Sequence, residues 1–305
     1  MATSGGYTLL VGSRTDRKGL AGGFGAHLMW GVFPLYFHLL QRSGAVEIVA
    51  HRIAWTLVFC LVAVSLTGGW GKVRAVLANG RLFGTLLGAG VLVSLNWLIY
   101  VYAVVTGHVV DAALGYFINP LVTVVLAMVF LRERVTPAQV VALVVGLAAV
   151  LVIVIGVGRV PWIGLGLALT FGFYSLAKSR VGGQVSGFVG LGVEALALAP
   201  LSVAYILVLE LTGRGTFLSI SWPYALLLAA TGVVTALPLL AFAVGAARLP
   251  LVTLAFIQYV TPVMQFLIGV LFFGEHMPVV RWVGFVLVWI ALLILSADTL
   301  RRTRP

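Results

Sequence analysis

The feature that most restricts the fold of this chain is a series of ten apolar runs, each close to the ~20 residues with which a helix crosses the hydrocarbon core of a bilayer. The runs lie at residues 20–40, 46–66, 82–105, 109–131, 136–157, 161–178, 186–209, 222–245, 250–273 and 279–298. Only 9% of the residues are charged, against about 25% in ordinary soluble domains. The sequence therefore predicts an all-α integral membrane protein with ten transmembrane helices.

The distribution of Lys and Arg over the links and tails predicts the orientation. If the N-terminus is cytoplasmic, fourteen Lys and Arg residues fall on the cytoplasmic side, and Arg42, Arg159, Arg214 and Arg281 fall on the other. This excess follows the positive-inside rule and predicts that both termini are cytoplasmic. We therefore interpret the net charge of +11 as a sign of membrane orientation and not of nucleic-acid binding.

The second half of the chain repeats the first at a shift of 142 residues, so that Pro120 meets Pro262 and Glu133 meets Glu275. Each half holds five apolar runs, and because five is odd, the halves would enter the membrane from opposite sides, as in inverted-repeat transporters. The predicted organisation is a cytoplasmic tail at 1–18, five-helix repeats at 19–157 and 158–300, and a basic C-terminal tail at 301–305.

Both repeats carry a proline in the middle of an apolar run, in ALGYFINPLVTVVLAMVFLRE and LAFIQYVTPVMQFLIGVLFFGE. A proline inside a helix removes one hydrogen bond and breaks or kinks the helix, so we expect helix breaks at Pro120, Pro238 and Pro262. In a bilayer, the freed carbonyl must face protein or a wet cavity. Two interpretations stay open: a substrate cavity at mid-membrane, or packing kinks whose polar groups hold helices together. The cavity interpretation takes as its lining residues Asn96, Tyr100, Tyr116, Asn119, Gln258, Tyr259 and Gln265.

Four charged residues in or beside the runs require an explanation. Arg52 lies inside the second run, and the repeat pairs it with Glu194 in the seventh. We predict an intramembrane charge pair between them, close to the substrate path; the alternative is that Arg52 extends to the outer interface. Glu133 and Glu275 stand at tight turns, where a carboxylate would stabilise the N-terminus of the next helix.

The motifs of soluble chemistry do not occur in the sequence. It contains no HExxH, GxSxG or phosphate-binding loop, and Cys60 is its single cysteine. The sequence therefore predicts no enzyme activity, no cofactor and no metal site. Three Gly-x-x-x-Gly pairs, at positions 19/23, 84/88 and 183/187, would allow close contact between helices.

Several longer segments resemble the RarD-type branch of the EamA permeases, in the drug/metabolite transporter (DMT) superfamily. They are HRIAW (51–55), NWLIYVYAV (96–104), LGYFINPLV (114–122), RERVTPAQ (132–139), GLGVEALALAP (190–200), TALPLLAFAVGAARLPL (235–251) and IQYVTPVMQFLIGVLFFGE (257–275). The resemblance spans roughly residues 19–297 and implies ten helices in two inverted EamA repeats in a bacterial cytoplasmic (inner) membrane. Ala195 stands where the branch leads us to expect a threonine, which removes one polar group from the expected pocket.

We therefore predict a secondary transporter of a small metabolite or drug that works by alternating access between the repeats, with a link to chloramphenicol sensitivity that the name of the branch implies. The bilayer and a small-molecule substrate are its expected partners, with a proton or ion as the candidate coupling partner. Trp55, at the end of HRIAW, joins the candidate substrate-binding residues. The alternative is a lipid scramblase or a membrane-embedded binding or sensor subunit.

Overall fold

The structure is a computed structural model that describes residues 17–132, 134–181, 184–246, 248–249 and 251–303. Within these ranges the regular structure is helical throughout. Seven helices are long and apolar enough to cross a membrane, so the chain is a multi-pass membrane protein. They are α3 (Ala45–Leu66), α5 (Gly80–Val105), α6 (Val109–Leu126), α7 (Pro137–Val157), α9 (Gly187–Leu211), α10 (Trp222–Ala246) and α13 (Val279–Thr303).

The other helical segments are shorter, less apolar or interrupted. They are α1 (Arg17–Gly31), α2 (Phe33–His38), α4 (Trp70–Ala78), α8 (Trp162–Val181), α11 (Leu251–Ile257) and α12 (Val260–Leu267). Two π-helical turns, η1 (Ala127–Leu131) and η2 (Ile268–Phe272), extend α6 and α12. The short α4 lies in the link between two of the predicted runs, where we did not expect a helix.

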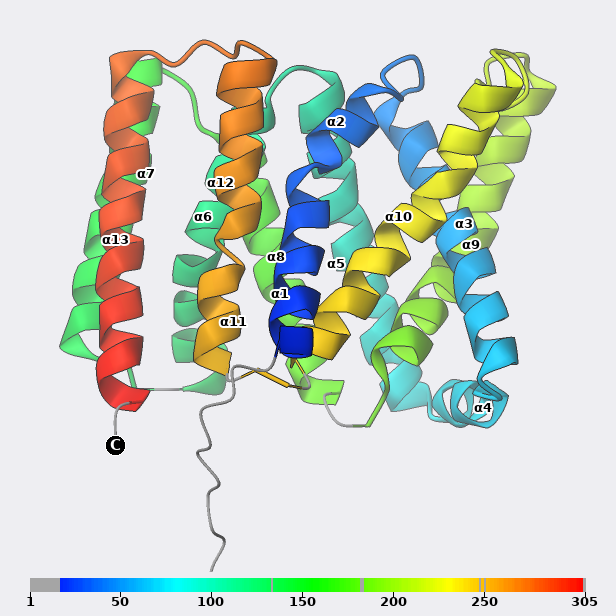
Figure 1. Cartoon of the computed structure of the whole chain (residues 1–305), viewed down its shortest axis with the longest axis horizontal. Coiled ribbons are helices and arrows are strands. Elements are labelled where there is room, and N and C mark those ends of the chain that lie inside the picture. Colours follow the sequence, from blue (N-terminus) through cyan, green and yellow to red (C-terminus); the bar gives the residue numbers. More distant parts are fainter. Residues whose placement is uncertain (1–16, 133, 182–183, 247, 250, 304–305) are drawn as a thin grey trace, which may run out of the picture.

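The helices form one bundle in which segments far apart in the sequence lie side by side (Figure 1). At one edge α7 packs against α13, and at the other α3 packs against both α9 and α10. Between them α8 packs against α5 and α6, while α1 packs against α10 and α12. A buried apolar cluster joins α2, α3, α5, α6, α8 and α10, and it forms the surroundings of the candidate site.

Local signals in the sequence define the ends of α7. Thr136 accepts a hydrogen bond from the Gln139 N–H at 3.0 Å, and the Gln139 side chain accepts one from the Thr136 N–H at 2.9 Å. This capping box, with Pro137 in the first turn, starts the helix. Gly158 ends it with a φ of 74°, which a glycine adopts without steric cost.

The backbones of α6 and α8 approach so closely at position 115 that only glycine fits there. An added Cβ there would lie 2.6 Å from the carbonyl oxygen of Gly164 and 2.9 Å from Cβ of Leu167. This contact brings α6 against α8. The predicted Gly84/Gly88 pair behaves differently, because a Cβ at either position would meet nothing within 4 Å in the part of the chain that the structure describes.

The prolines break fewer helices than we expected from the sequence. Helix α6 continues through Pro120 and α10 through Pro238, so the predicted breaks at these two positions are absent. A single proline removes only its own hydrogen bond, and the remaining bonds of the turn preserve the helix. An interruption occurs near Pro262, between α11 and α12. Pro262 has no N–H to donate to the carbonyl of Gln258. That carbonyl instead accepts a hydrogen bond from the Thr261 N–H at 3.3 Å.

Candidate functional site

Arg52 lies inside the bundle with its guanidinium among aromatic rings, and only 4% of the residue is exposed. The guanidinium carbon lies 4.0 Å from the ring centroid of Trp97 on α5, and 5.4 and 5.7 Å from those of Phe37 and Phe33 on α2. Its Nε donates a hydrogen bond to the Thr235 hydroxyl on α10 at 2.8 Å. The guanidinium is therefore held at its Nε edge by Thr235 and stacked on one face against Trp97. The alternative prediction, that Arg52 extends to the membrane interface, does not fit this buried position.

Three tyrosines complete the surroundings of Arg52. Tyr36, Tyr100 and Tyr116 are close enough to interact electrostatically with its guanidinium, and the rings of Tyr100 and Tyr116 lie 5.9 Å apart. Tyr36 donates a 2.5 Å hydrogen bond to the Leu227 carbonyl. The buried Tyr100 hydroxyl has no hydrogen-bond partner among the described residues. We refer to Arg52, Trp97, Tyr100, Tyr116, Phe33 and Phe37 as the arginine–aromatic cluster.

Asn96, one of the predicted lining residues, connects two helices. Its Nδ2 donates to the Leu167 carbonyl and to the Thr170 hydroxyl on α8, at 3.0 Å each. It is 2% exposed. This geometry matches the packing interpretation, in which polar side chains hold helices together across a membrane.

Asn119 and Gln265 each retain an unused polar atom. Nδ2 of Asn119 and Oε1 of Gln265 are buried and have no hydrogen-bond partner among the described residues. Gln265 donates through Nε2 to the carbonyl of Trp30 at 3.1 Å, and Asn119 accepts through its side-chain oxygen from the Thr123 hydroxyl at 3.2 Å. Both residues therefore have free capacity for a bound molecule.

Contacts of the other candidate lining residues lie outside the arginine–aromatic cluster. Gln258 is exposed, and Tyr259 packs against a second apolar cluster that contains Phe266. The half-buried Trp55 has its ring 6.1 Å from that of Phe217. Of the residues predicted to line one cavity, the structure therefore brings only Tyr100 and Tyr116 next to Arg52.

The structure gives Arg52 and Glu194 different partners from those the repeat predicted. Glu194, which is 2% exposed, pairs with Lys178 of α8 at 2.6 Å, whereas Arg52 bonds to Thr235. Lys178, one of the fourteen basic residues counted on the cytoplasmic side, lies in the last turn of α8, and its Nζ donates to Oε1 of Glu194 on α9. Matching positions in the two halves therefore placed both charges within long helices, α3 and α9, but did not predict which groups they contact.

We expect Lys178→Met to destabilise the protein by about 3 kcal/mol, because it leaves the Glu194 carboxylate buried without its counter-charge. The value is at the lower end for a buried pair because the Lys178 side chain is 28% exposed. Adding Glu194→Gln to this variant should restore most of the lost stability. The check is the midpoint of thermal unfolding of the purified single and double variants; a double variant no more stable than Lys178→Met would contradict the pairing.

Glu275 stabilises a helix N-terminus, but not that of the next helix as we predicted. Its carboxylate accepts hydrogen bonds from the N–H groups of Val109 and Val110 at the start of α6, at 2.5 and 3.0 Å. Burial raises the pKa of this carboxyl, and the two N–H donors oppose the shift in part. The fold thus brings the loop before α13 to the start of α6. Glu133, its predicted counterpart, lies outside the described residues.

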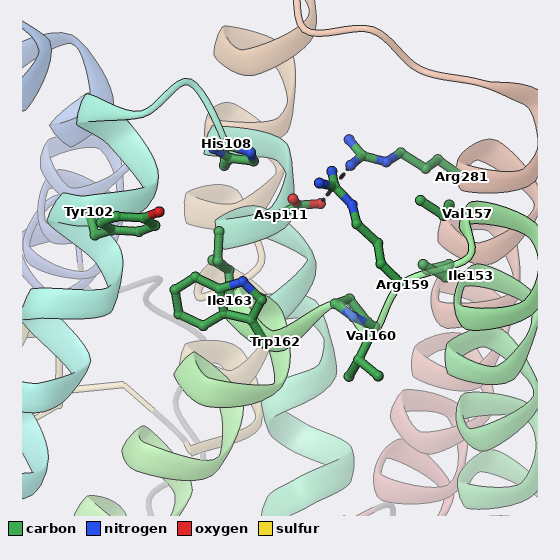
Figure 2. Close-up of a pocket in the computed structure, with 11 residues that line it drawn as sticks. Tyr102, His108, Asp111, Ile153, Val157, Arg159, Val160, Trp162, Ile163 and Arg281 are labelled. Atoms are coloured by element: carbon green, nitrogen blue, oxygen red, sulfur yellow. Dashed lines mark ion pairs between the residues drawn. The ribbon is translucent and has the colours of Figure 1, made fainter.

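A pocket of about 180 Å³ opens at one end of the bundle, and none of the predicted site residues lines it. Arg159 and Arg281 extend toward Asp111 there, and Arg281 forms an ion pair with it at 3.4 Å (Figure 2). The Tyr102 and Trp162 rings, 5.5 Å apart, form another wall. Since α5, α6, α7, α8 and α13 all contribute, the pocket is a second candidate site for a polar molecule.

Sequence reasoning missed two parts of these sites. Phe33 and Phe37 were overlooked because FPLYFH looks like ordinary apolar filling of a helix. The pocket residues Arg159 and Arg281 had a usable signal, because both are among the four basic residues that depart from the positive-inside rule. A cation on the less basic side of the membrane has a cost in topology, so it is a candidate for a functional role.

Comparison with known proteins gives a consistent family. The model of the EamA-like transporter family matches residues 17–155. Protein RarD of Streptomyces exfoliatus is 47% identical over 289 residues, with 95% of this chain and 91% of the relative covered. Protein RarD of Escherichia coli (strain K12) is 36% identical over 294 residues, with 95% of this chain and 99% of the relative covered.

A solved structure described as the crystal structure of a protein shares the fold, with a TM-score of 0.61 over 94% of this chain and 99% of the other, at 20% identity. Since the sequence matches extend over about 95% of the chain, the chain is a homologue of membrane transporters. The chain belongs to the EamA-like transporter family, in the DMT superfamily, and is similar to its RarD members.

Proposed function

We propose that this protein is a ten-span secondary transporter of a small molecule, built from two inverted halves in a bacterial inner membrane with both termini in the cytoplasm. Each of the seven long helices would cross once, and α1–α2, α8 and α11–α12–η2 would supply the other crossings. The start of α1 and the end of α13 lie at the same end of the bundle, the lower one in Figure 1, which supports an even number of crossings.

The packing pattern supports the inverted repeat. In the repeat, α1, α5 and α6 of the first half correspond to α8, α10 and α12 of the second. The contact between α1 and α10 therefore has its counterpart in the contact between α8 and α5, and the contact between α6 and α8 has its counterpart in that between α12 and α1. The self-corresponding pairs α3–α9, α6–α12 and α7–α13 also pack together. The π-helical turns η1 and η2 occur at Ala127 and Ile268, close to the repeat shift.

The observation that carries the proposal is the position of Arg52. A charged residue inside a membrane bundle costs about 2.5–3.5 kcal/mol on insertion scales, and such residues usually mark a substrate or ion path. Arg52 sits where α3 and α5 of the first half meet Thr235 of α10 in the second. Relative motion of the halves would change what surrounds it, as alternating access requires.

The proposal is tested by transport into proteoliposomes. We expect purified protein to give saturable uptake of one or a few solutes from a panel of small metabolites and drugs that includes chloramphenicol. Protein-free liposomes and vesicles with heat-unfolded protein are the controls. If lipid analogues exchange between leaflets and no solute is taken up, the scramblase alternative replaces the transporter.

The cavity itself can be tested without knowing the substrate. We expect cysteines at positions 116 and 119, in a Cys60→Ala background, to react with a small membrane-impermeant thiol reagent, because Asn119 has an unsatisfied buried amide. Cysteine at position 267, where Leu267 is exposed on the outer surface of the bundle, is the lipid-facing control. Equal lack of labelling at all three positions would argue against a wet path beside α6.

A further inference from the structure

We infer that the transported molecule carries an anionic group, a carboxylate or another oxyanion, and that this group pairs with Arg52. The inference rests on the proposed transport function, whose substrate it narrows to a chemical class. It also assigns the arginine–aromatic cluster as the binding site, with the rings in contact with an apolar or aromatic part of the same molecule.

The first argument is that the charge of Arg52 is not neutralised within the described chain. One of its five N–H donors is used, by the bond from Nε to Thr235. The terminal Nη atoms have no acceptor, and no carboxylate lies within 4.0 Å of them, among the residues that the structure describes. Only 4% of the residue is exposed, so water has less access to these donors than it has at a surface.

The second argument is that the acidic residues of the adjoining helices already have partners. On α3, Glu47 accepts hydrogen bonds from the N–H and the hydroxyl of Thr216, at 2.6 and 2.9 Å. Glu194 on α9 pairs with Lys178, and Asp111 on α6 pairs with Arg281. A rotation that brought Glu47 or Asp111 to Arg52 would leave another donor unpaired, whereas Glu194 uses one oxygen for Lys178 and keeps Oε2 without a partner among the described residues. The counter-charge is best supplied by a molecule from outside.

The third argument is the unused hydroxyl of Tyr100. It is buried, has no partner among the described residues, and belongs to a ring near Arg52. A phenol can donate a hydrogen bond to an oxyanion while a guanidinium binds the same group through two parallel N–H bonds. Cationic substrates are disfavoured by the same geometry, because a second positive charge would be repelled where no acidic side chain compensates.

The test compares carboxylic acids with their own amides, which have nearly the same shape but no charge. Purified protein is titrated with acetate and acetamide, benzoate and benzamide, phenylacetate and phenylacetamide, and indole-3-acetate and indole-3-acetamide, at constant ionic strength. We expect at least one acid to bind about tenfold or more tightly than its amide, because the coupling energies measured for close charge pairs correspond to a factor of this size or larger. If every acid binds no better than its amide, the inference is wrong.

Two variants show whether the preference comes from the arginine–aromatic cluster. Arg52→Gln should bind acid and amide equally. Tyr100→Phe should leave the unfolding temperature unchanged, since the lost hydroxyl has no partner in the described structure, yet weaken the preferred acid by roughly fivefold. A Tyr100→Phe variant that binds the acid like the wild type, together with an Arg52→Gln variant that keeps the acid preference, would overturn the assignment.

The binding and transport results separate the two proposals. An acid that binds through Arg52 but is never transported would leave the anion site standing and refute the transporter. Saturable transport of a neutral solute such as chloramphenicol, with no effect of Arg52→Gln, would support the transporter and refute the anion site. Acid flux that follows an imposed membrane potential, without a matching response of the amide, is the result expected if both are correct.

Discussion

Gly115→Leu is expected to prevent recovery of folded protein from the membrane, and Gly115→Ala to lower stability by about 1–3 kcal/mol, the usual range for overpacking. Even one methyl group at this position would meet the Gly164 carbonyl oxygen at 2.6 Å. Since that oxygen belongs to backbone, the clash can be relieved only by moving α6 away from α8. Both helices contribute to the surroundings of the candidate site, so the damage would extend beyond the point of contact.

Gly88 provides the matched control, since a Cβ there would meet nothing within 4 Å in the described chain. Gly88→Ala should be neutral or stabilising by about 0.5–1 kcal/mol, because alanine loses less backbone entropy in a helix than glycine. The measurement is the yield of monodisperse protein on gel filtration, followed by thermal unfolding. Equal losses for the alanine variants at 88 and 115 would show that the two glycines do not differ as the packing indicates.

Arg52→Lys is expected to reduce transport by about 30-fold or more, although it conserves the charge. Lysine lacks the planar guanidinium that stacks on an indole and binds an oxyanion through two parallel bonds. In wild type that guanidinium lies 4.0 Å from the centroid of Trp97. The decisive measurement is the initial uptake rate, in proteoliposomes, of whichever solute the wild type transports, normalised to the amount of inserted protein.

Arg81→Lys is the control for this substitution, because Arg81 is exposed at the start of α5. Its transport should match the wild type. Normal transport by Arg52→Lys would mean that a point charge is sufficient at position 52, and the stacking on Trp97 would then be a packing contact.

The sequence predicted the helices well and their contacts poorly. The run predicted at 186–209 became α9, which ends at Leu211, and the run at 136–157 became α7 almost residue for residue. Composition is sufficient for this, because any span must be apolar over its whole length. Which face of a span meets protein was not readable, since lipid-facing and buried faces are equally apolar and no amphipathic pattern separates them.

For the two buried charges too, the sequence predicted the helix that carries each residue but not its contacts. Arg52 and Glu194 are both buried, as expected of the second and seventh runs, but their partners depend on how α3, α8, α9 and α10 are rotated about their axes. A rotation of one residue moves a side chain by about 100°, which is enough to exchange Glu194 for Thr235 as the neighbour of a guanidinium. Sequence spacing gives position along a helix, whereas pairing depends on rotation between helices.

The bond between Glu275 and the start of α6 has a consequence for how the molecule can move. Two N–H donors converge on one carboxylate, and charge-assisted bonds of this kind are about twice as strong as neutral ones. Pulling α6 away from the η2–α13 loop would break both at once, so their separation at this end is costly. The interruption between α11 and α12 lies inside the same span, and α11 continues beyond it. Helix α6 and the α12–η2 segment would thus stay together at the Glu275 end, while α11, on the far side of the interruption, could change its direction independently.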